Sequence, residues 1–233
     1  VPVIDGFTKR QATKRLGIAG RTVTERLIEL LGRRGYAVGR TNDVDSIREM
    51  KESVCFVAKE RKRWLRLARE TTACAESYEL PDGRRIKVES ERFMAPEIMF
   101  EPSLVGVESV GVSELVFECV QECDMDSRMT MYENIVLSGG STTFPGFGER
   151  LKKDLVDLYK ERILKSDPNA NVEKFVNRVN VETPADRKYS VFVGGSVLAN
   201  IMKDNDKFWV TRQEYEKLGI TKALRKCEGT FHE

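Results

Sequence analysis

Two adjacent glycines, Gly139 and Gly140, interrupt the segment IVLSGGSTTFPGF, which runs from Ile135 to Phe147. An apolar run typical of a strand precedes them, and an apolar pattern with helical spacing follows. A strand that ends in two glycines lets the backbone come close to a flat or anionic ligand, because no Cβ intervenes and free N–H groups point outward. The same residues also suit a tight turn without a ligand, and residue types alone leave both uses open.

The sequence lacks the patterns of the common phosphate, metal and triad sites. Neither G-x-x-x-x-G-K nor G-x-G-x-x-G occurs, so the glycine loop is neither a P-loop nor a dinucleotide fingerprint. The single histidine, His232, argues against a histidine-based triad or metal site. The five cysteines show no metal-ligand spacing, and we expect reduced thiols. We therefore expect no catalytic residue and no metal ligand in this chain.

The 233 residues carry a formal net charge of +2. This balance does not favour nucleic acid as a partner, and without a run of about 18 apolar residues we expect no membrane partner. One local exception is Lys59–Glu70, KERKRWLRLARE, where six basic residues surround Trp64. Because Trp64 and Leu67 form an apolar stripe, we expect an exposed helix that faces a protein, with nucleic acid as the weaker alternative.

Helices and strands together must position the glycine loop, which indicates an α/β protein. Residues 19–36 have helical spacing, with Thr22 and Glu25 as a capping box. A second helix is expected from about Asp45, and two more begin near Ser113 and Asp126 as caps. After the glycine loop, a further helix carries an apolar stripe, made of Phe147, Leu151, Leu155 and Leu158.

Three strand regions are expected besides the one before the glycine loop. Residues 1–7, VPVIDGF, read as a strand, and 77–93 read as a hairpin that turns at Pro81-Asp82-Gly83. Residues 189–193 read as a strand that meets a second Gly-Gly-Ser at 194–196, followed by an apolar helix. The two strand–glycine–helix units hint at a repeat. The polar segment 165–175 reads as a surface loop.

The segment VLSGGSTTFPGFGERL, residues 136–151, resembles VLSGGTTMYPG of the actins and actin-related proteins. Further segments resemble the same family in the same order, namely VPVIDGF (1–7), RLGIAGRTVTERLIELLGRRGY (15–36), IREMKESVCFVA (47–58), SYELPDGRRIKVESERF (77–93) and DRKYSVFVGGSVLA (186–199). Several long matches in register over nearly the whole chain make this resemblance specific, unlike a lone glycine motif.

The resemblance implies the two-lobed actin-like ATPase fold, an α/β fold of the ribonuclease H-like sugar kinase and chaperone superfamily, with ATP between the lobes. It implies mainly the second large lobe. Residues 1–18 and 108–189 would form a subdomain 3-like core, and 19–107 a subdomain 4-like unit. Residues 190–233 would belong to a subdomain 1 whose remainder lies upstream of Val1. The sequence also lacks an initiator Met, so we expect a piece of a longer protein.

The resemblance also assigns the adenosine side of an ATP site to nine residues: Gly20, Arg21, Lys51, Glu52, Gly139, Gly140, Ser141, Phe144 and Lys188. Glu52 would accept hydrogen bonds from the ribose, and Lys51 and Lys188 would flank the adenine. Mg²⁺ or Ca²⁺ would bind through the nucleotide. Thr22 replaces a family Asp, and Thr142-Thr143-Phe144 replaces a family Thr-Met-Tyr, which weakens the expected purine contacts. The phosphate loops would lie upstream, so we expect no ATP hydrolysis by this chain alone.

By the same resemblance we expect a cytoplasmic, cytoskeletal subunit of the complex that nucleates branched actin filaments. Its partners would be the other subunits, actin and nucleation-promoting factors. A filament-forming conventional or divergent actin is one alternative, and a nuclear actin-related protein of a chromatin remodeller is another. A small-molecule kinase or chaperone ATPase on the same fold is a third, since a fold alone does not fix function.

Overall fold

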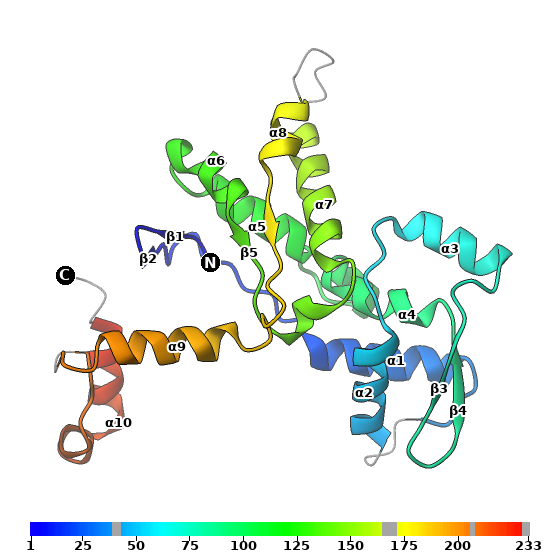
Figure 1. Cartoon of the computed structure of the whole chain (residues 1–233), viewed down its shortest axis with the longest axis horizontal. Coiled ribbons are helices and arrows are strands. Elements are labelled where there is room, and N and C mark those ends of the chain that lie inside the picture. Colours follow the sequence, from blue (N-terminus) through cyan, green and yellow to red (C-terminus); the bar gives the residue numbers. More distant parts are fainter. Residues whose placement is uncertain (39–42, 165–171, 206–207, 230–233) are drawn as a thin grey trace.

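A computed structural model describes residues 1–38, 43–164, 172–205 and 208–229. Helices and strands are both present, as expected for an α/β chain (Figure 1). In chain order the elements are β1 (Val3–Ile4), β2 (Phe7–Thr8), α1 (Gly20–Arg33), α2 (Val44–Val54), α3 (Arg61–Glu70), β3 (Glu76–Glu79), β4 (Arg85–Val88), α4 (Glu91–Met94), η2 (Pro96–Met99), η3 (Pro102–Val105), α5 (Val112–Gln121), α6 (Met125–Glu133), β5 (Ile135–Val136), η4 (Gly140–Thr143), α7 (Phe147–Arg162), α8 (Val172–Arg178), β6 (Val181–Glu182), α9 (Ser190–Ile201) and α10 (Arg212–Gly229).

The strands of the described ranges pair as three small two-stranded sheets. β1 with β2 and β3 with β4 are antiparallel, whereas β5 and β6 are parallel, with Ile135 opposite Val181. Most of the apolar core lies among helices: α1 packs on α2, and α5 packs along α7. Among the helices of the described ranges, none is both long and apolar enough to traverse a bilayer.

The apolar stripes predicted from helical spacing face this core. Val23, Leu27 and Leu31 of α1 are fully buried, and so are Ile47 and Met50 of α2. The burial of these residues supplies the main driving force for the two helices, since short helices gain little stability from propensity alone. The stripe of α7 is confirmed in the same way, because three of its four members are buried and Leu158 packs against the core.

The predicted hairpin is present as β3 and β4, with Tyr78 opposite Ile86. Gly83 takes a φ of +82° at the turn, a value that favours glycine. The expected strand over 1–7 is divided, because a tight turn at Asp5 and Gly6, with φ values of +52° and +85°, folds β2 back on β1.

The helix starts predicted from capping residues are wrong at three places. α1 begins at Gly20, ahead of Thr22, and its N-cap residue Ala19 makes no side-chain cap. Ser113 lies inside α5, where its hydroxyl is 3.1 Å from Asp154 Oδ2 on α7. Asp126 lies in the first turn of α6, where its charge favours the helix N-terminus without a cap bond. Ser113 thus makes a tertiary hydrogen bond, and Asp126 interacts favourably with the helix dipole, in place of the predicted caps.

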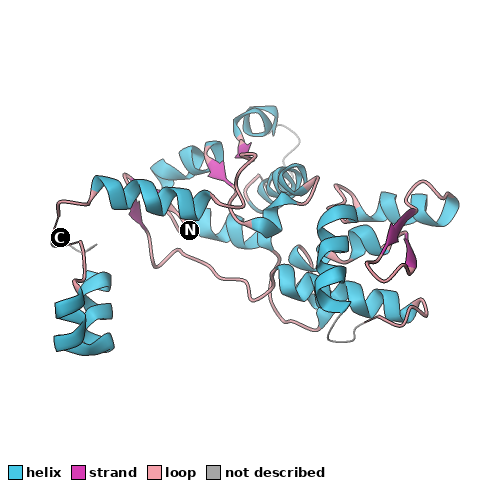
Figure 2. Cartoon of the chain, turned by 60° about the horizontal axis from the view of Figure 1, so that its bottom comes forward, coloured by secondary structure: helices cyan, strands magenta, loops and turns pink. Residues whose placement is uncertain are grey.

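The predicted strand at 189–193 is also wrong, because α9 begins at Ser190 and continues through Gly194 and Gly195. Neither glycine has a positive φ, so neither breaks the helix. A strand needs a neighbour to pair with, and this segment projects from the rest of the chain (Figure 1), while the part of the chain near the C-terminus is drawn as helix in Figure 2. The hint of a repeated strand–glycine–helix unit is therefore wrong. In the expected loop 165–175, residues 165–171 lie outside the described ranges, and Val172–Phe175 are helical in α8.

Candidate functional site

Three segments enclose a small cleft: the N-terminus of α1, one face of α2 and the glycine loop before α7. The cleft has a volume of about 300 Å³. Its lining consists of Gly20, Arg21, Arg48, Lys51, Glu52, Gly140, Ser141, Thr143 and Phe144. Residues that are far apart in the sequence therefore meet here through the packing of α1 on α2 and of the loop on both.

Two glycines, one in the cleft lining and one beside it, shape this part of the molecule. A Cβ on Gly20 would lie 3.1 Å from Ser141 Oγ and 3.5 Å from Lys51 Nζ, so the loop and α1 approach closely here, and a side chain at this position would require the Ser141 hydroxyl to shift. Gly139 has a φ of +90°, which a residue with a side chain rarely adopts. The Gly139 N–H donates to Arg187 O at 2.8 Å, and its carbonyl accepts from Thr142 Oγ1 at 2.8 Å. Gly139 therefore shapes the loop from outside the cleft lining.

Lys51 is a buried cation at the cleft, with 5% of its surface exposed. Its ammonium donates to the Gly20 carbonyl at 3.1 Å and to Thr24 Oγ1 at 3.2 Å, which ties α2 to the first turn of α1. Burial lowers the pKa of Lys51, since removal from water disfavours the charged form. In the described ranges no carboxylate lies within salt-bridge distance of Lys51 Nζ. Its charge is therefore available to an electron-rich ligand.

Glu52 and Lys188 stand at the rim and face each other. Their side chains are 55% and 53% exposed, and Glu52 Oε2 lies 3.9 Å from Lys188 Nζ. An exposed pair at this distance contributes little stability, so either group can exchange its partner for a ligand at small cost. A carboxylate at the rim can accept hydrogen bonds from hydroxyl groups. Lys51 contributes the buried positive charge, whereas Arg48 is exposed and pairs with Asp45 at 3.3 Å.

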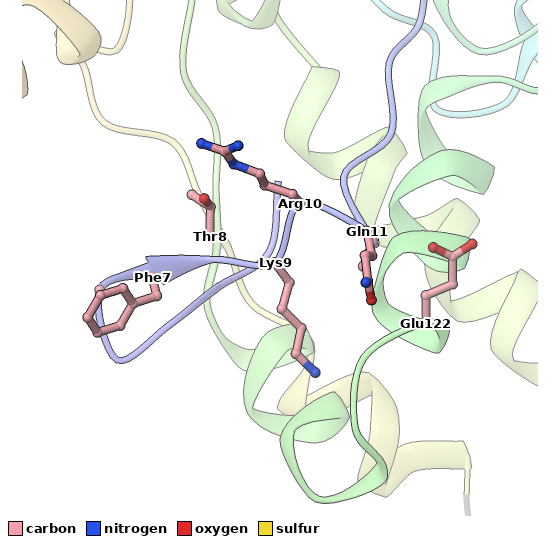
Figure 3. Close-up of a pocket in the computed structure, with 8 residues that line it drawn as sticks. Phe7, Thr8, Lys9, Arg10, Gln11 and Glu122 are labelled. Carbon is pink, nitrogen blue, oxygen red and sulfur yellow. The ribbon is translucent and has the colours of Figure 1, made fainter. Parts of the chain in front are cut away.

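A larger hollow of about 720 Å³ lies beside the N-terminal hairpin (Figure 3). It holds none of the nine predicted residues and is lined by residues 6–12 and Glu122. Its main charges are already paired, Lys9 with Asp124 and Glu122 with Lys14. In Figure 3 the Lys9 and Glu122 side chains border the open space, and Phe7 lies on the outer side of the hairpin. Size alone does not make this hollow the better candidate, because two of its charged groups, Lys9 and Glu122, already pair within the chain.

Comparison with known proteins decides the family. The family model described as Actin matches residues 1–228. The chain belongs to the actin family. It is 48% identical over 227 residues to actin-related protein 2 of Oryza sativa subsp. japonica. The aligned residues make up 97% of this chain and 57% of the relative. Proteins of the same name from Arabidopsis thaliana and Caenorhabditis briggsae are each 47% identical, covering 94% and 97% of this chain and 56% and 57% of the relatives. The chain thus spans somewhat more than half the length of these curated relatives.

This actin-family member has the actin-like ATPase fold, as its sequence predicted, and most of its predicted site residues converge. Seven of the nine line the cleft, while Gly139 and Lys188 lie outside its lining. A Cβ on Gly140 would lie 3.8 Å from Lys188 Cγ, so Lys188 borders the cleft. Phe144 is only 6% exposed, which leaves most of its ring in the core.

Arg48 and Thr143 line the cleft although the sequence reading did not include them. Arg48 stands three and four residues before Lys51 and Glu52, and this spacing places all three on one face of a helix. That spacing was the signal for Arg48. Thr143 donates to the Gly140 carbonyl at 2.6 Å and so stabilises the turn, which its residue type alone did not indicate.

The remaining sequence predictions concern cysteines and metals. Cys55, Cys74, Cys119 and Cys123 are buried free thiols, whereas the Cys227 side chain and His232 lie outside the described part. In the described ranges, no three His, Cys, Asp or Glu side chains gather in a group that could hold a metal ion.

Proposed function

We propose that this chain supplies the adenosine side of an ATP-binding cleft in an actin-related subunit of the actin-related protein 2/3 complex, which nucleates branched actin filaments in the cytoplasmic cytoskeleton. The observation that carries the proposal is the convergence of seven predicted residues on one cleft, built from three separate segments. The relatives named actin-related protein 2 support the choice of this subunit. Other subunits of that complex, actin and nucleation-promoting factors would be its partners.

In this proposal each wall of the cleft has a separate task. Glu52 accepts hydrogen bonds from the ribose hydroxyls, and Lys51 and Lys188 flank the adenine from the floor and the rim. Gly20, Arg21 and Ser141 border the purine edge, where the absent Cβ of Gly20 makes room. Mg²⁺ or Ca²⁺ reaches the site through the phosphates of ATP, and the chain itself provides no catalytic group.

The proposed subdomains follow the same family resemblance. Residues 1–18 and 108–189 form the subdomain 3-like core, and 19–107 form the subdomain 4-like unit. The cleft then lies where these units meet, since α1 and α2 belong to the second and the glycine loop to the first. Residues 190–233 belong to a subdomain 1-like unit, which the exposed apolar side chains of α9 support.

The test is substitution of Glu52 by alanine in the intact protein, which includes the expected upstream phosphate loops, followed by calorimetric titration with ATP. Loss of a charged acceptor should weaken ATP binding by about 1–3 kcal/mol. Glu49→Ala is the matched control, because Glu49 is an exposed glutamate on the same helix and outside the cleft lining. Unchanged affinity in Glu52→Ala would show that Glu52 is only a surface charge. Copurification with the other subunits, rather than with a remodelling ATPase, tests the assignment to the complex.

A further inference from the structure

Helix α3 is the most basic element of the chain, and the nucleotide cleft does not use it. Lys59, Lys62, Arg63, Arg66 and Arg69 follow one another along the helix and its N-terminal flank, and all five are exposed. None of the five forms a salt bridge with a residue of the described ranges. Unpaired cations at this density repel one another and outnumber the two glutamates of the segment, Glu60 and Glu70, so the helix retains a positive local field that attracts anions.

The same helix has an apolar side that is only half covered. No residue of α3 is fully buried. Trp64 packs its ring edge-on against Phe56 at 4.8 Å between centroids and lies 6.1 Å from Phe93, while its other side remains partly exposed. The small cluster beneath α3 therefore anchors the helix without enclosing it.

A hollow of about 540 Å³ joins the two features. Its lining consists of Lys59, Glu60, Arg63, Trp64, Arg66, Leu67 and Glu70. The floor is apolar, from Trp64 and Leu67, and the walls carry three cations. Figure 1 draws α3 at the margin of the molecule, on the side away from α9 and α10.

The helix is held in this position at its N-terminal end. Arg61 forms an ion pair with Glu101, which precedes η3. Because Arg61 is engaged there, it does not add to the free cations. The ion pair and the packing of Trp64 on Phe56 together hold the helix whose Arg63 and Arg66 border the hollow. The surface is therefore preformed, which reduces the entropy that a partner must lose on binding.

We propose that α3 is a docking surface for an acidic polypeptide segment that carries a large apolar side chain. The apolar side chain covers Trp64 and Leu67, and flanking aspartates or glutamates pair with Lys59, Arg63 and Arg66. The cationic walls require the negative charge, and the apolar floor requires the hydrophobic anchor, as in other interfaces where a buried anchor sits inside a polar rim.

Nucleic acid fits this surface less well. The ten-residue helix is about 15 Å long, at roughly 1.5 Å per residue, and it offers few phosphate contacts. Glu60 and Glu70 line the hollow at its ends and would repel a continuous chain of phosphates. An acidic peptide can place its charges between these two glutamates.

The experiment measures binding of a short fluorescein-labelled peptide of aspartate and glutamate with a central pair of leucines, at low salt, by fluorescence anisotropy. The comparison probes are the same peptide with serines for the leucines and an oligodeoxythymidine of equal charge. The double variant Arg63→Glu, Arg66→Glu should weaken binding of the leucine peptide by about tenfold or more, because it turns attraction into repulsion. The matched control is the double variant Arg212→Glu, Lys217→Glu on α10. It makes the same change in net charge away from α3 and should alter the affinity for the leucine peptide by less than about twofold.

A second readout follows Trp64 itself. The chain has two tryptophans, so Trp209→Phe leaves Trp64 as the only one. Covering its exposed side with leucine should shift its emission to shorter wavelength, and the serine peptide should not. Equal binding of both peptides, tighter binding of the oligodeoxythymidine, or equal loss in both charge-reversal variants would each overturn the proposal.

Discussion

Lys51 shows how one side chain can hold the cleft together and still remain available to a ligand. Its two hydrogen bonds, to a carbonyl and a hydroxyl, leave the positive charge uncompensated by any carboxylate within salt-bridge distance among the described residues. The sequence identified Lys51 by family resemblance. It could not reveal the burial of the ammonium, because that depends on the packing of Gly20 and Thr24 of α1 onto α2.

Cys55, one helical turn after Lys51, gives a pH dependence of stability. Burial raises the pKa of its thiol from 9.0 to about 12. Between these values the unfolded chain releases this proton while the folded chain keeps it, so the free energy of unfolding falls as pH rises above 9. At pH 8, Cys55→Ala should have a lower free energy of unfolding than the wild type. This difference in free energy should decrease by about 1.4 kcal/mol by pH 10, because only the wild type loses stability there.

Urea unfolding at several pH values from about 8 to 10 measures this gap. Val54→Ala serves as the control, because Val54 is a buried neighbour that does not titrate. Its gap to the wild type should not change with pH. Parallel curves for Cys55→Ala and the wild type would contradict the raised pKa.

At the scale of elements, the Arg150 side chain bonds to segments that lie far apart in the sequence. Its guanidinium lies 3.0 Å from Glu97 on η2, 2.8 Å from Asp154 on α7 and 2.8 Å from the Ala58 carbonyl after α2. Asp154 also accepts from Ser113 of α5. Glu97 is 1% exposed, and its burial raises its pKa despite the nearby guanidinium.

Arg150→Met should therefore destabilise the fold by about 3–5 kcal/mol, because it leaves the buried Glu97 carboxyl without its ion-pair partner. Lys153→Met is the matched control on the same helix, since Lys153 pairs with an exposed Asp157 at 3.0 Å. That change should cost less than about 1 kcal/mol. Urea denaturation of both variants checks the difference, and equal midpoints would show that the buried pair contributes no net stability.

Element types were predictable wherever periodicity and burial agree. The stripes of α1, α2 and α7 and the alternation of β3 and β4 were visible in the sequence, since these faces meet the core. Helix starts were less predictable, because a residue such as Ser113 or Asp126 suits a cap as well as a tertiary hydrogen bond or a charge in the first turn. At α9, Val191, Phe192 and Val193 favour a strand by residue type, yet among the described residues no strand pairs with them and the segment is helical.

At the scale of the whole molecule, the chain divides into a core and a C-terminal arm. Most elements up to β6, from α1 onward, share one main apolar core, and α3 and α4 pack on a second, smaller cluster around Phe93. Beyond it, α9 projects outward and α10 follows farther out (Figures 1 and 2). In α9 the apolar side chains are exposed on several sides, with Val191 and Phe192 each 78% exposed. A helix this apolar is ordinarily covered, which is consistent with the proposed subdomain 1-like assignment of residues 190–233.

Hydrogen exchange measures this division directly. Amides of α9 should exchange much faster than those of α7, because local opening of α9 exposes little additional apolar surface, whereas opening of α7 disrupts the core around Leu151 and Leu155. Peptides from α1 provide a second protected reference, since Leu27 and Leu31 are fully buried. The measurement is repeated over a range of protein concentrations. Protection of α9 that rises with concentration would identify a second copy as its cover. Protection equal to that of α7 at every concentration would show that residues 190–233 have a complete core of their own, and their assignment to a separate lobe would be wrong.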